Sequence, residues 1–441
     1  LYKHLSRACF RLGDLEKSEA YVRTGLSLLG ENLPSSDGLM MLMTIKELLV
    51  HRVLDLLPVS FFPLMKKTRP QRLEMIIGLY EWLNWVYFFS EGWKMARTVF
   101  RMLNLCRMRL GKTHEFASTC YYFGFFSVAT GDYKGASRYL NLSCEMMKKY
   151  NNSLGIAQCL GGWAFYSFMR GDFPRCGEFS KQSIDILEKI GDFVEISKSG
   201  QFLFNSYFLQ SQYPPARLLY EKYHVYSRTM FEDMTYSSFA FPFIYYIETG
   251  QYRTAKETLD SFIPYQEKHK TWFLYFTSLS LYGYCCAEEG DIEKSLDYYE
   301  RAYEVFRNNR FPSHTHIFFQ HYAEAMITDL IQRGHALTAK EKKSYHKKIR
   351  NACLLGLRHT EKWSHNFDVA LRAFARYCLI TGKTSRAERF FLKSIAHSKK
   401  IRRRYEFART LFEYGIFLNE RNRKEEAREV FLNAYGTFSE L

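Results

Sequence analysis

The sequence lacks the motifs of the common phosphate-transfer enzymes. It contains two Gly-Lys-Thr triplets, at 111–113 and 382–384, but a phosphate-binding loop also needs a glycine five residues before the triplet. Cys106 and Tyr377 occupy those two positions. The glycine-rich loop and the H-R-D and D-F-G triplets of a protein kinase are missing as well. The catalytic parts of an ATPase or a kinase are therefore excluded from this chain.

Long apolar runs and a secretory leader are also absent. The stretch closest to a membrane span, 271–287, has 17 residues without a charge, but it contains several hydroxyl side chains and falls short of the roughly 20 residues that a span needs. Lys3, His4 and Arg7 interrupt the start, where a leader would be apolar. We expect a cytoplasmic protein without membrane insertion. Because the chain begins at Leu1 inside a helical pattern, we also expect a piece of a longer protein.

The ten cysteines include no C-x-x-C pair, so neither a zinc site nor a disulfide framework is indicated. Cys9, Cys286 and Cys378 fall at core positions of the repeat described next, which favours buried structural thiols in a reducing compartment. The acidic residues are scattered, and no pair of them repeatedly faces one cleft. We therefore predict no metal, no cofactor and no catalytic residue, that is, a protein that is not an enzyme.

What the sequence does contain is repetition. The stretches TGDYKGASRY (130–139), TGQYRTAKET (249–258) and TGKTSRAERF (381–390) share a Thr-Gly start and an alanine five residues after the glycine. Aligning the chain on this small residue gives a period near 40, with one diverged unit expected in each of two longer intervals. The anchors are Ser18, Ala96, Ala136, Cys176, Ala216, Ala255, Ser295, Ala387 and Ala427.

Each unit is predicted to be two helices joined by a tight corner. Glycine suits the left-handed position that ends a helix, and an aspartate such as Asp132 caps the next helix. Small residues recur twelve positions before the anchor, and large apolar residues recur four positions after it. Close antiparallel pairing of two helices needs this combination at the crossing point. The glycines among the small residues are Gly124, Gly283 and Gly415.

These positions resemble the tetratricopeptide repeat, whose period is about 34 residues. The resemblance implies an all-α fold, a right-handed superhelical solenoid of about ten to eleven helix-turn-helix repeats. No single pair can bury its apolar face, so the units must stack on one another. We expect residues 1–441 to form one such solenoid.

Two segments depart from the repeat. Residues 31–72 lack the corner motif and contain four prolines, so we expect a diverged repeat with a longer helix followed by a basic loop. Residues 333–358 are expected to hold an insertion and a lysine-rich helix, and Thr338 and Glu341 have the spacing of a capping box at its start.

Several longer stretches look like landmarks of one known group. They are GLSLLGENLP (25–34), KELLVHRVLDLLP (46–58), RLEMIIGLYEWLNWVYFFSEGWKMA (72–96) and RRRYEFARTLFEYG (402–415). Together they are similar to the helical-repeat region of large bacterial signalling proteins, which combine a Ser/Thr kinase or adenylyl cyclase with an AAA/STAND ATPase and sometimes a histidine kinase. The resemblance implies a regulatory module that binds a protein or peptide, or packs against the ATPase or kinase domain of its own longer chain.

Positive charge is concentrated near the end of the chain. The formal net charge is +16, and residues 331–441 hold 25 Lys and Arg against 11 Asp and Glu. Such an end attracts acidic partners, so the bound protein or peptide is expected to be acidic. Two alternatives stay open: a stand-alone tetratricopeptide-type peptide receptor, and nucleic-acid binding through the basic quarter, although no nucleic-acid motif accompanies the charge.

The first helix of each unit lines the concave face in tetratricopeptide arrays. Arg372 and Arg376, four residues apart, share a helix face and are expected to grip a carboxylate or phosphate together; ordinary salt bridges between repeats are the alternative. The groove positions carried over from the resemblance are Lys198, Gln201, Asn205, Glu248, Tyr284, Glu288, Arg372 and Arg376.

Overall fold

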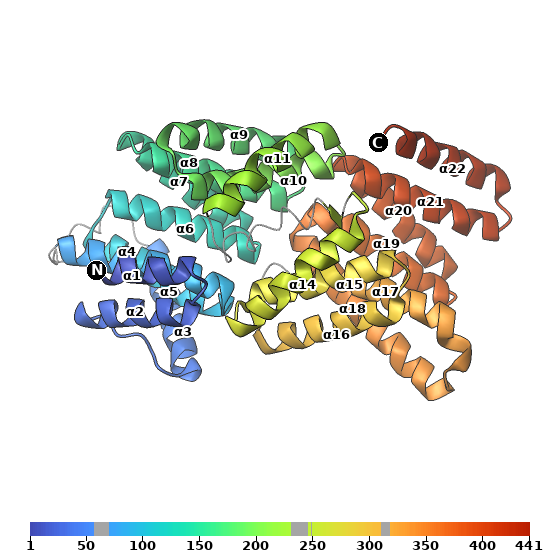
Figure 1. Ribbon diagram of the computed structural model, residues 1–441, viewed down its shortest axis with the longest axis horizontal. Helices are drawn as coiled ribbons and strands as arrows, with labels where there is room; N and C mark the ends of the chain where they lie inside the picture. Colours follow the sequence, from blue (N-terminus) through green and yellow to red (C-terminus); the bar gives the residue numbers. More distant parts are fainter. Residues whose placement is uncertain (57–69, 231–245, 248, 310–317) are drawn as a thin grey trace.

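The computed structural model describes residues 1–56, 70–230, 246–247, 249–309 and 318–441 (Figure 1). Over these ranges the chain forms 20 α-helices and two short 3-10 helices, and no strand. The prediction of an all-α, tetratricopeptide-like solenoid is confirmed.

The helices of the N-terminal half are α1 (Tyr2–Arg11), α2 (Leu15–Leu28), α3 (Asp37–Leu56), α4 (Pro70–Phe89), α5 (Gly92–Arg109), α6 (His114–Thr130), α7 (Tyr133–Lys149), α8 (Ser153–Met169), α9 (Phe173–Ile190), α10 (Phe193–Leu209) and α11 (Tyr213–Met230). Those of the C-terminal half are α14 (Tyr252–Lys268), α15 (Trp272–Glu288), α16 (Ile292–Asn309), α17 (Phe318–Arg333), α18 (Ala339–Lys362), α19 (Phe367–Ile380), α20 (Thr384–Lys400), α21 (Arg404–Glu420) and α22 (Lys424–Ser439). Two 3-10 helices, η3 (Gly334–Ala336) and η4 (Ser364–Asn366), flank α18.

The corners follow the predicted chemistry. Gly131 ends α6 with φ of 80°, and Asp132 then accepts a hydrogen bond from the backbone N–H of Gly135 at 3.0 Å. Asp14 caps α2 in the same way, accepting from the N–H of Lys17 at 3.0 Å. A left-handed glycine and an acidic cap satisfy the open ends of both helices, so these two corners are defined by local sequence.

The paired helices cross at the predicted glycines. A Cβ added to Gly124 on α6 would lie 2.8 Å from Leu140 Cγ on α7, and one on Gly415 would lie 2.7 Å from Phe431 Cε1. A Cβ on Gly283 would approach the ring of Tyr299 at 3.2 Å. Each large residue lies four positions after its anchor, so the predicted match of small and large residues is confirmed.

This packing predicts the response to a single methyl group. Gly124→Ala should lower the free energy of unfolding by about 1–3 kcal/mol, because Leu140 is fully buried and must shift. Gly436→Ala on α22 is the matched control, since a Cβ there meets nothing within 4 Å; it should stabilise by up to about 1 kcal/mol through helix propensity. Urea unfolding measures both, and equal effects of the two substitutions would contradict the crossing-point argument.

A buried hydroxyl joins the helices of several pairs. Ser143, Ser183 and Ser394 each lie seven residues after an anchor and donate to a carbonyl of the first helix of their pair. The acceptors are Ala117 O at 2.6 Å, Ala157 O at 2.8 Å and Asp368 O at 2.8 Å. A serine at this position therefore satisfies its hydroxyl without losing the close helix contact.

The two diverged segments each contain a distinctive helix. In 31–72 the long helix is α3, which packs beside α5, while α4 packs directly against α1 and α2. The expected basic loop, at 57–69, lies outside the described residues. In 333–358 the structure confirms the capping box: Thr338 and Glu341 exchange hydrogen bonds at the start of α18, which is 24 residues long.

The superhelix brings its two halves into contact. Trp363, at the end of α18, donates from Nε1 to Val128 O of α6 at 3.2 Å, and Ser364 donates to Arg170 O at 2.6 Å. Near the N-terminus, Tyr265 at the end of α14 donates to Leu12 O at 3.1 Å. Phe88 of α4 meets Phe273 of α15 edge to face, with 5.6 Å between the ring centres. Figure 1 shows the two halves side by side, with α14 and α15 crossing toward the N-terminal helices.

The charge-free stretch 271–287 forms most of α15, whose side chains pack into the protein core, including Leu274, Phe276, Leu279 and Cys285. Among the helices that the structure describes, none combines the length and the apolar character needed to cross a bilayer.

Candidate functional site

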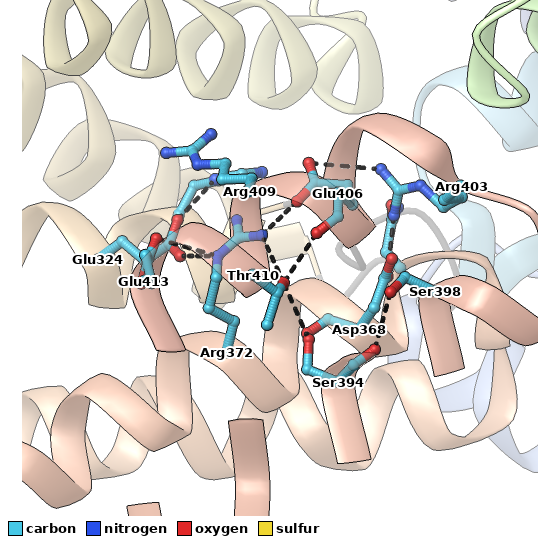
Figure 2. A network of polar contacts seen from close by, with 12 residues as sticks. Glu324, Asp368, Arg372, Ser394, Ser398, Arg403, Glu406, Arg409, Thr410 and Glu413 are labelled. Atoms are coloured by element: carbon cyan, nitrogen blue, oxygen red, sulfur yellow. Dashed lines mark hydrogen bonds and ion pairs between the residues drawn. The ribbon is translucent and has the colours of Figure 1, made fainter. Parts of the chain in front are cut away.

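The first helices α15, α17, α19 and α21 share a network of charged side chains (Figure 2). At its centre is Arg372 of α19, whose side chain has no exposed surface. Its Nε lies 3.3 Å from Glu324 Oε1 of α17 and 3.4 Å from Glu413 Oε1 of α21, and its Nη1 bonds Glu406 of α21. One guanidinium thus holds three carboxylates from the two neighbouring first helices.

The network continues along the start of α21. Arg403 donates to Asp368 Oδ1 at 2.9 Å and to the carbonyl of His365 at 3.0 Å, and its Nη2 lies 3.7 Å from Glu406 Oε1. Asp368 and Arg403 are both buried. Figure 2 shows Glu406 between the two arginines, so this carboxylate joins the two parts of the network.

A half-buried rim surrounds this core. Arg409 of α21 donates to Glu288 Oε1 of α15 at 3.2 Å, which joins residues 121 positions apart. Arg376 donates to Thr328 Oγ1 at 3.3 Å and lies 3.9 Å from Glu413 Oε2. The rings of Tyr284 and His321 meet edge to face at 4.8 Å. We call Tyr284, Glu288, His321, Arg376, Arg409 and Glu413 the charged rim.

Burial and the arginines have opposite effects on the acidic groups. Burial alone would raise the pKa of Glu406, but Arg372 and Arg403 overcome it and lower the pKa to about 2. Arg372 and His321 likewise overcome burial at Glu324 and lower its pKa well below the usual range. At Glu413 burial prevails over Arg372 and Arg376, so its pKa is raised. Glu324 and Glu406 therefore stay ionised to lower pH than Glu413 does.

The structure brings four of the predicted groove residues together. Tyr284, Glu288, Arg372 and Arg376 all belong to this network or its rim. Arg372 is engaged by three carboxylates of the chain itself, while Arg376 keeps about a quarter of its side chain exposed.

The predicted residues of α10 lie elsewhere. Lys198 pairs with Glu195 at 2.7 Å, and its ammonium lies 4.0 Å from the ring centre of Trp85 on α4. Gln201 is half-buried and Asn205 is buried. Glu248 lies outside the described residues.

Most of the residues that contact Arg372 and Glu288 were not identified from the sequence. Glu406, Arg409 and Glu413 are spaced by three and four residues, so they share one face of α21. That spacing marks a charged face on a first helix and was the available signal. Their contact with Arg372 and Glu288 depends on how neighbouring repeats stack, which the spacing does not contain.

Most cysteines are packed side chains, as predicted for Cys286 and Cys378, but Cys9 is half-buried, so the prediction of a buried thiol there is wrong. All but Cys9 and Cys144 are buried, and burial raises the pKa of Cys286 to about 11 and of Cys285 to about 12. Within the described part of the chain, no three His, Cys, Asp or Glu side chains are grouped so that they could hold a metal ion.

Comparison with known proteins gives one match to a family and several solved folds. Residues 276–309, in α15 and α16, match the tetratricopeptide repeat. No curated protein shows significant similarity.

Three solved structures resemble the chain at low sequence identity. The apo form of RapI is 15% identical, covers 64% of this chain and 98% of its own, and has a TM-score of 0.44. A Rap protein complexed with competence and sporulation factor is 10% identical over 92% of this chain and 99% of its own, with a TM-score of 0.38. A human IFIT1 dimer with m7Gppp-AAAA is 16% identical over 92% and 83%, with a TM-score of 0.48. The chain is a tetratricopeptide-like helical-repeat solenoid, a fold that typically serves as a non-catalytic interaction scaffold.

Proposed function

We propose that the chain is a non-catalytic, regulatory interaction module that binds a protein or peptide on the charged rim of its C-terminal half. The observation that carries the proposal is the half-buried set of charges on α15, α17, α19 and α21, which are held by ion pairs with one another and, through Glu413, with the buried Arg372. Side chains fixed in this way meet a partner at a lower entropic cost than mobile surface charges do.

The charges of the rim set the kind of partner. Arg376 and Arg409 offer guanidinium donors beside the acceptors Glu288 and Glu413, and Tyr284 and His321 add aromatic surface. Such a mixed surface suits an extended peptide or loop that carries acidic and apolar side chains. Following the resemblance to signalling proteins, we take this partner to be the ATPase or kinase domain of the same longer chain.

The nucleic-acid alternative is not favoured at the charged rim, because the arginines in and beside it are already ion-paired within the chain. Arg372, Arg403 and Arg409 are paired with carboxylates in the network. Arg423 also binds Glu388 at 2.5 Å and Glu426 at 2.6 Å. Guanidinium groups neutralised in this way release few counterions from a phosphate backbone.

Site-specific photo-crosslinking tests the proposal. A benzophenone side chain replacing Tyr284 in the full-length protein should crosslink to its ATPase or kinase domain or to a partner protein. The same group at Leu392, exposed on α20, is the matched control and should give at most background crosslinking.

The outcomes distinguish the alternatives. A crosslink from Tyr284 to a short free peptide would favour a stand-alone receptor, and a crosslink to nucleic acid would favour the basic-end alternative. Equal yields from Tyr284 and Leu392 would remove the case for the charged rim.

A further inference from the structure

Helix α3 buries a mixed side, half of it polar or charged, and leaves a row of aliphatic side chains exposed. Its buried residues are Met40, Glu47, His51 and Leu54. The helix packs against α5, with further contacts to Phe123 of α6 and Tyr139 of α7. An apolar stripe on a helix normally faces the protein core, and here it faces away from it. The stripe consists of Leu42, Ile45, Leu49, Val53 and Leu56, which are between 49% and 85% exposed.

The reversed orientation is fixed by specific partners. Asn104 of α5 donates to Glu47 O and to Glu47 Oε2, both at 2.9 Å. Arg107 of α5 donates to Asp55 Oδ1 at 2.7 Å. If α3 rotated so that the stripe faced the core, the buried side chains of Asn104 and Arg107 would lose their hydrogen-bond partners, which is costly. The exposure of the stripe is therefore built into the fold.

Further contacts of α3 with α5, α6 and α7 hold it in this orientation. Arg101 of α5 lies 3.3 Å from Glu47 Oε1, and Tyr139 of α7 donates to Asp55 Oδ1 at 3.1 Å. The ring of His51 packs between Phe100 and Phe123, with ring centres 5.1 and 4.8 Å away. Figure 1 shows α3 at the outer edge of the N-terminal half, away from the charged rim.

The charges beside the stripe indicate what covers it. At 100° per residue, Lys46 and Arg52 flank the stripe on its two sides, and both are exposed. Neither makes an ion pair with the part of the chain that the structure describes. Both flanks are thus basic, and a complementary surface carries an apolar stripe between acidic flanks.

We propose that the stripe of α3 docks an amphipathic helix of another protein, whose apolar side is bordered by glutamate or aspartate. The helix would lie along α3, with its apolar side chains between Leu42 and Leu56 and its acids beside Lys46 and Arg52. This surface is separate from the charged rim and does not depend on the proposed function there.

Two other occupants fit less well. In a pair of α3 helices from two copies of the chain, basic flanks would face basic flanks, which is repulsive. Membrane-surface helices carry a Lys- and Arg-rich polar side and aromatic residues at the interface. The stripe is purely aliphatic, and the polar side of α3 faces the protein and carries the acids Glu47 and Asp55.

A synthetic helix tests the docking surface. The probe is a labelled three-heptad peptide with leucine at the core positions and glutamate at the flanking positions, used at concentrations where it is monomeric. Fluorescence anisotropy should show saturable binding to the 441-residue chain. Leu49→Glu should weaken this binding at least tenfold. Leu218→Glu, at a similarly exposed leucine on α11, should leave it unchanged, and both variants should keep wild-type helicity.

Reversing the charges beside the stripe provides a second test of the docking surface. Replacing Lys46 and Arg52 together by glutamate should shift preference at least tenfold toward a peptide with lysine in place of glutamate.

The proposal is overturned if the glutamate peptide does not saturate, or if Leu49→Glu and Leu218→Glu weaken it equally. A dimer in sedimentation equilibrium that Leu49→Glu dissociates would assign the stripe to a second copy. Cosedimentation with phosphatidylserine vesicles that the same variant abolishes would assign it to a membrane.

Discussion

Replacing Arg372 by methionine should lower the free energy of unfolding by about 3–5 kcal/mol. The guanidinium is fully buried and contacts Glu324, Glu406 and Glu413. Without it these carboxylates remain in a site of low dielectric with much less compensating positive charge, which is the costly case for a buried ion pair. Urea unfolding followed by circular dichroism measures the loss.

A neighbouring arginine provides the control. Arg376 is on the same helix, but its side chain is about a quarter exposed and its closest carboxylate contact is 3.9 Å. Arg376→Met should therefore cost no more than about 1 kcal/mol. Adding Glu406→Gln to Arg372→Met should recover part of the loss, because it removes one of the uncompensated charges.

The Arg372→Met defect should depend on pH in a defined direction. In the folded wild type, the pKa of Glu406 is lowered to about 2, because the arginines overcome its burial, whereas an unfolded glutamate titrates near 4.3. Glu406 thus stabilises the wild type above about pH 4.3, and this contribution is lost as the pH falls toward 2. In the variant the carboxylates bind protons more readily, so the gap between the two proteins should be widest near pH 7 and narrow toward pH 4. A gap that widens on acidification, or a defect under 1 kcal/mol, would show that Arg372 does not organise these acids.

The second large effect is expected at the contact between the two halves. Trp363 is 3% exposed, and its indole donates to Val128 O across 235 residues of sequence. Trp363→Ala should cost about 3–5 kcal/mol through the cavity and the lost contacts. Because the side chain joins α18 to α6, the superhelix should also open, which small-angle scattering would report as a larger radius of gyration.

A milder change at the same contact separates the loss of stability from the opening of the superhelix. Tyr133 is half-buried and donates to Lys362 O at 2.7 Å. Tyr133→Phe removes one hydrogen bond and should cost no more than about 1.5 kcal/mol without changing the scattering curve. If Trp363→Ala is destabilised but keeps the wild-type radius of gyration, the remaining contacts, such as Ser364 with Arg170 O, hold the halves together by themselves.

Part of the candidate site could be predicted from the repeat in the sequence, and part depends on contacts between residues far apart in the chain. Tyr284, Glu288, Arg372 and Arg376 could be placed on first helices from the repeat, and the structure gathers them. Whether Arg372 meets a ligand or other side chains could not be predicted, because Glu406 is 34 residues away and approaches only when the next pair stacks. The predicted binding role of these residues remains a proposal that the crosslinking experiment addresses.

The sequence alone determined the helices, the corners and the way two helices cross. Gly131 and Asp132 fix a corner through bonds that span a few residues, and Gly124 meets Leu140 inside one helix pair. Only the tertiary structure decided three further features: the pairing of Arg409 with Glu288, the packing of Trp363 against α6, and the outward orientation of the stripe of α3. The physical reason is that small rotations between successive pairs add up along the solenoid, and their sum determines which distant surfaces meet.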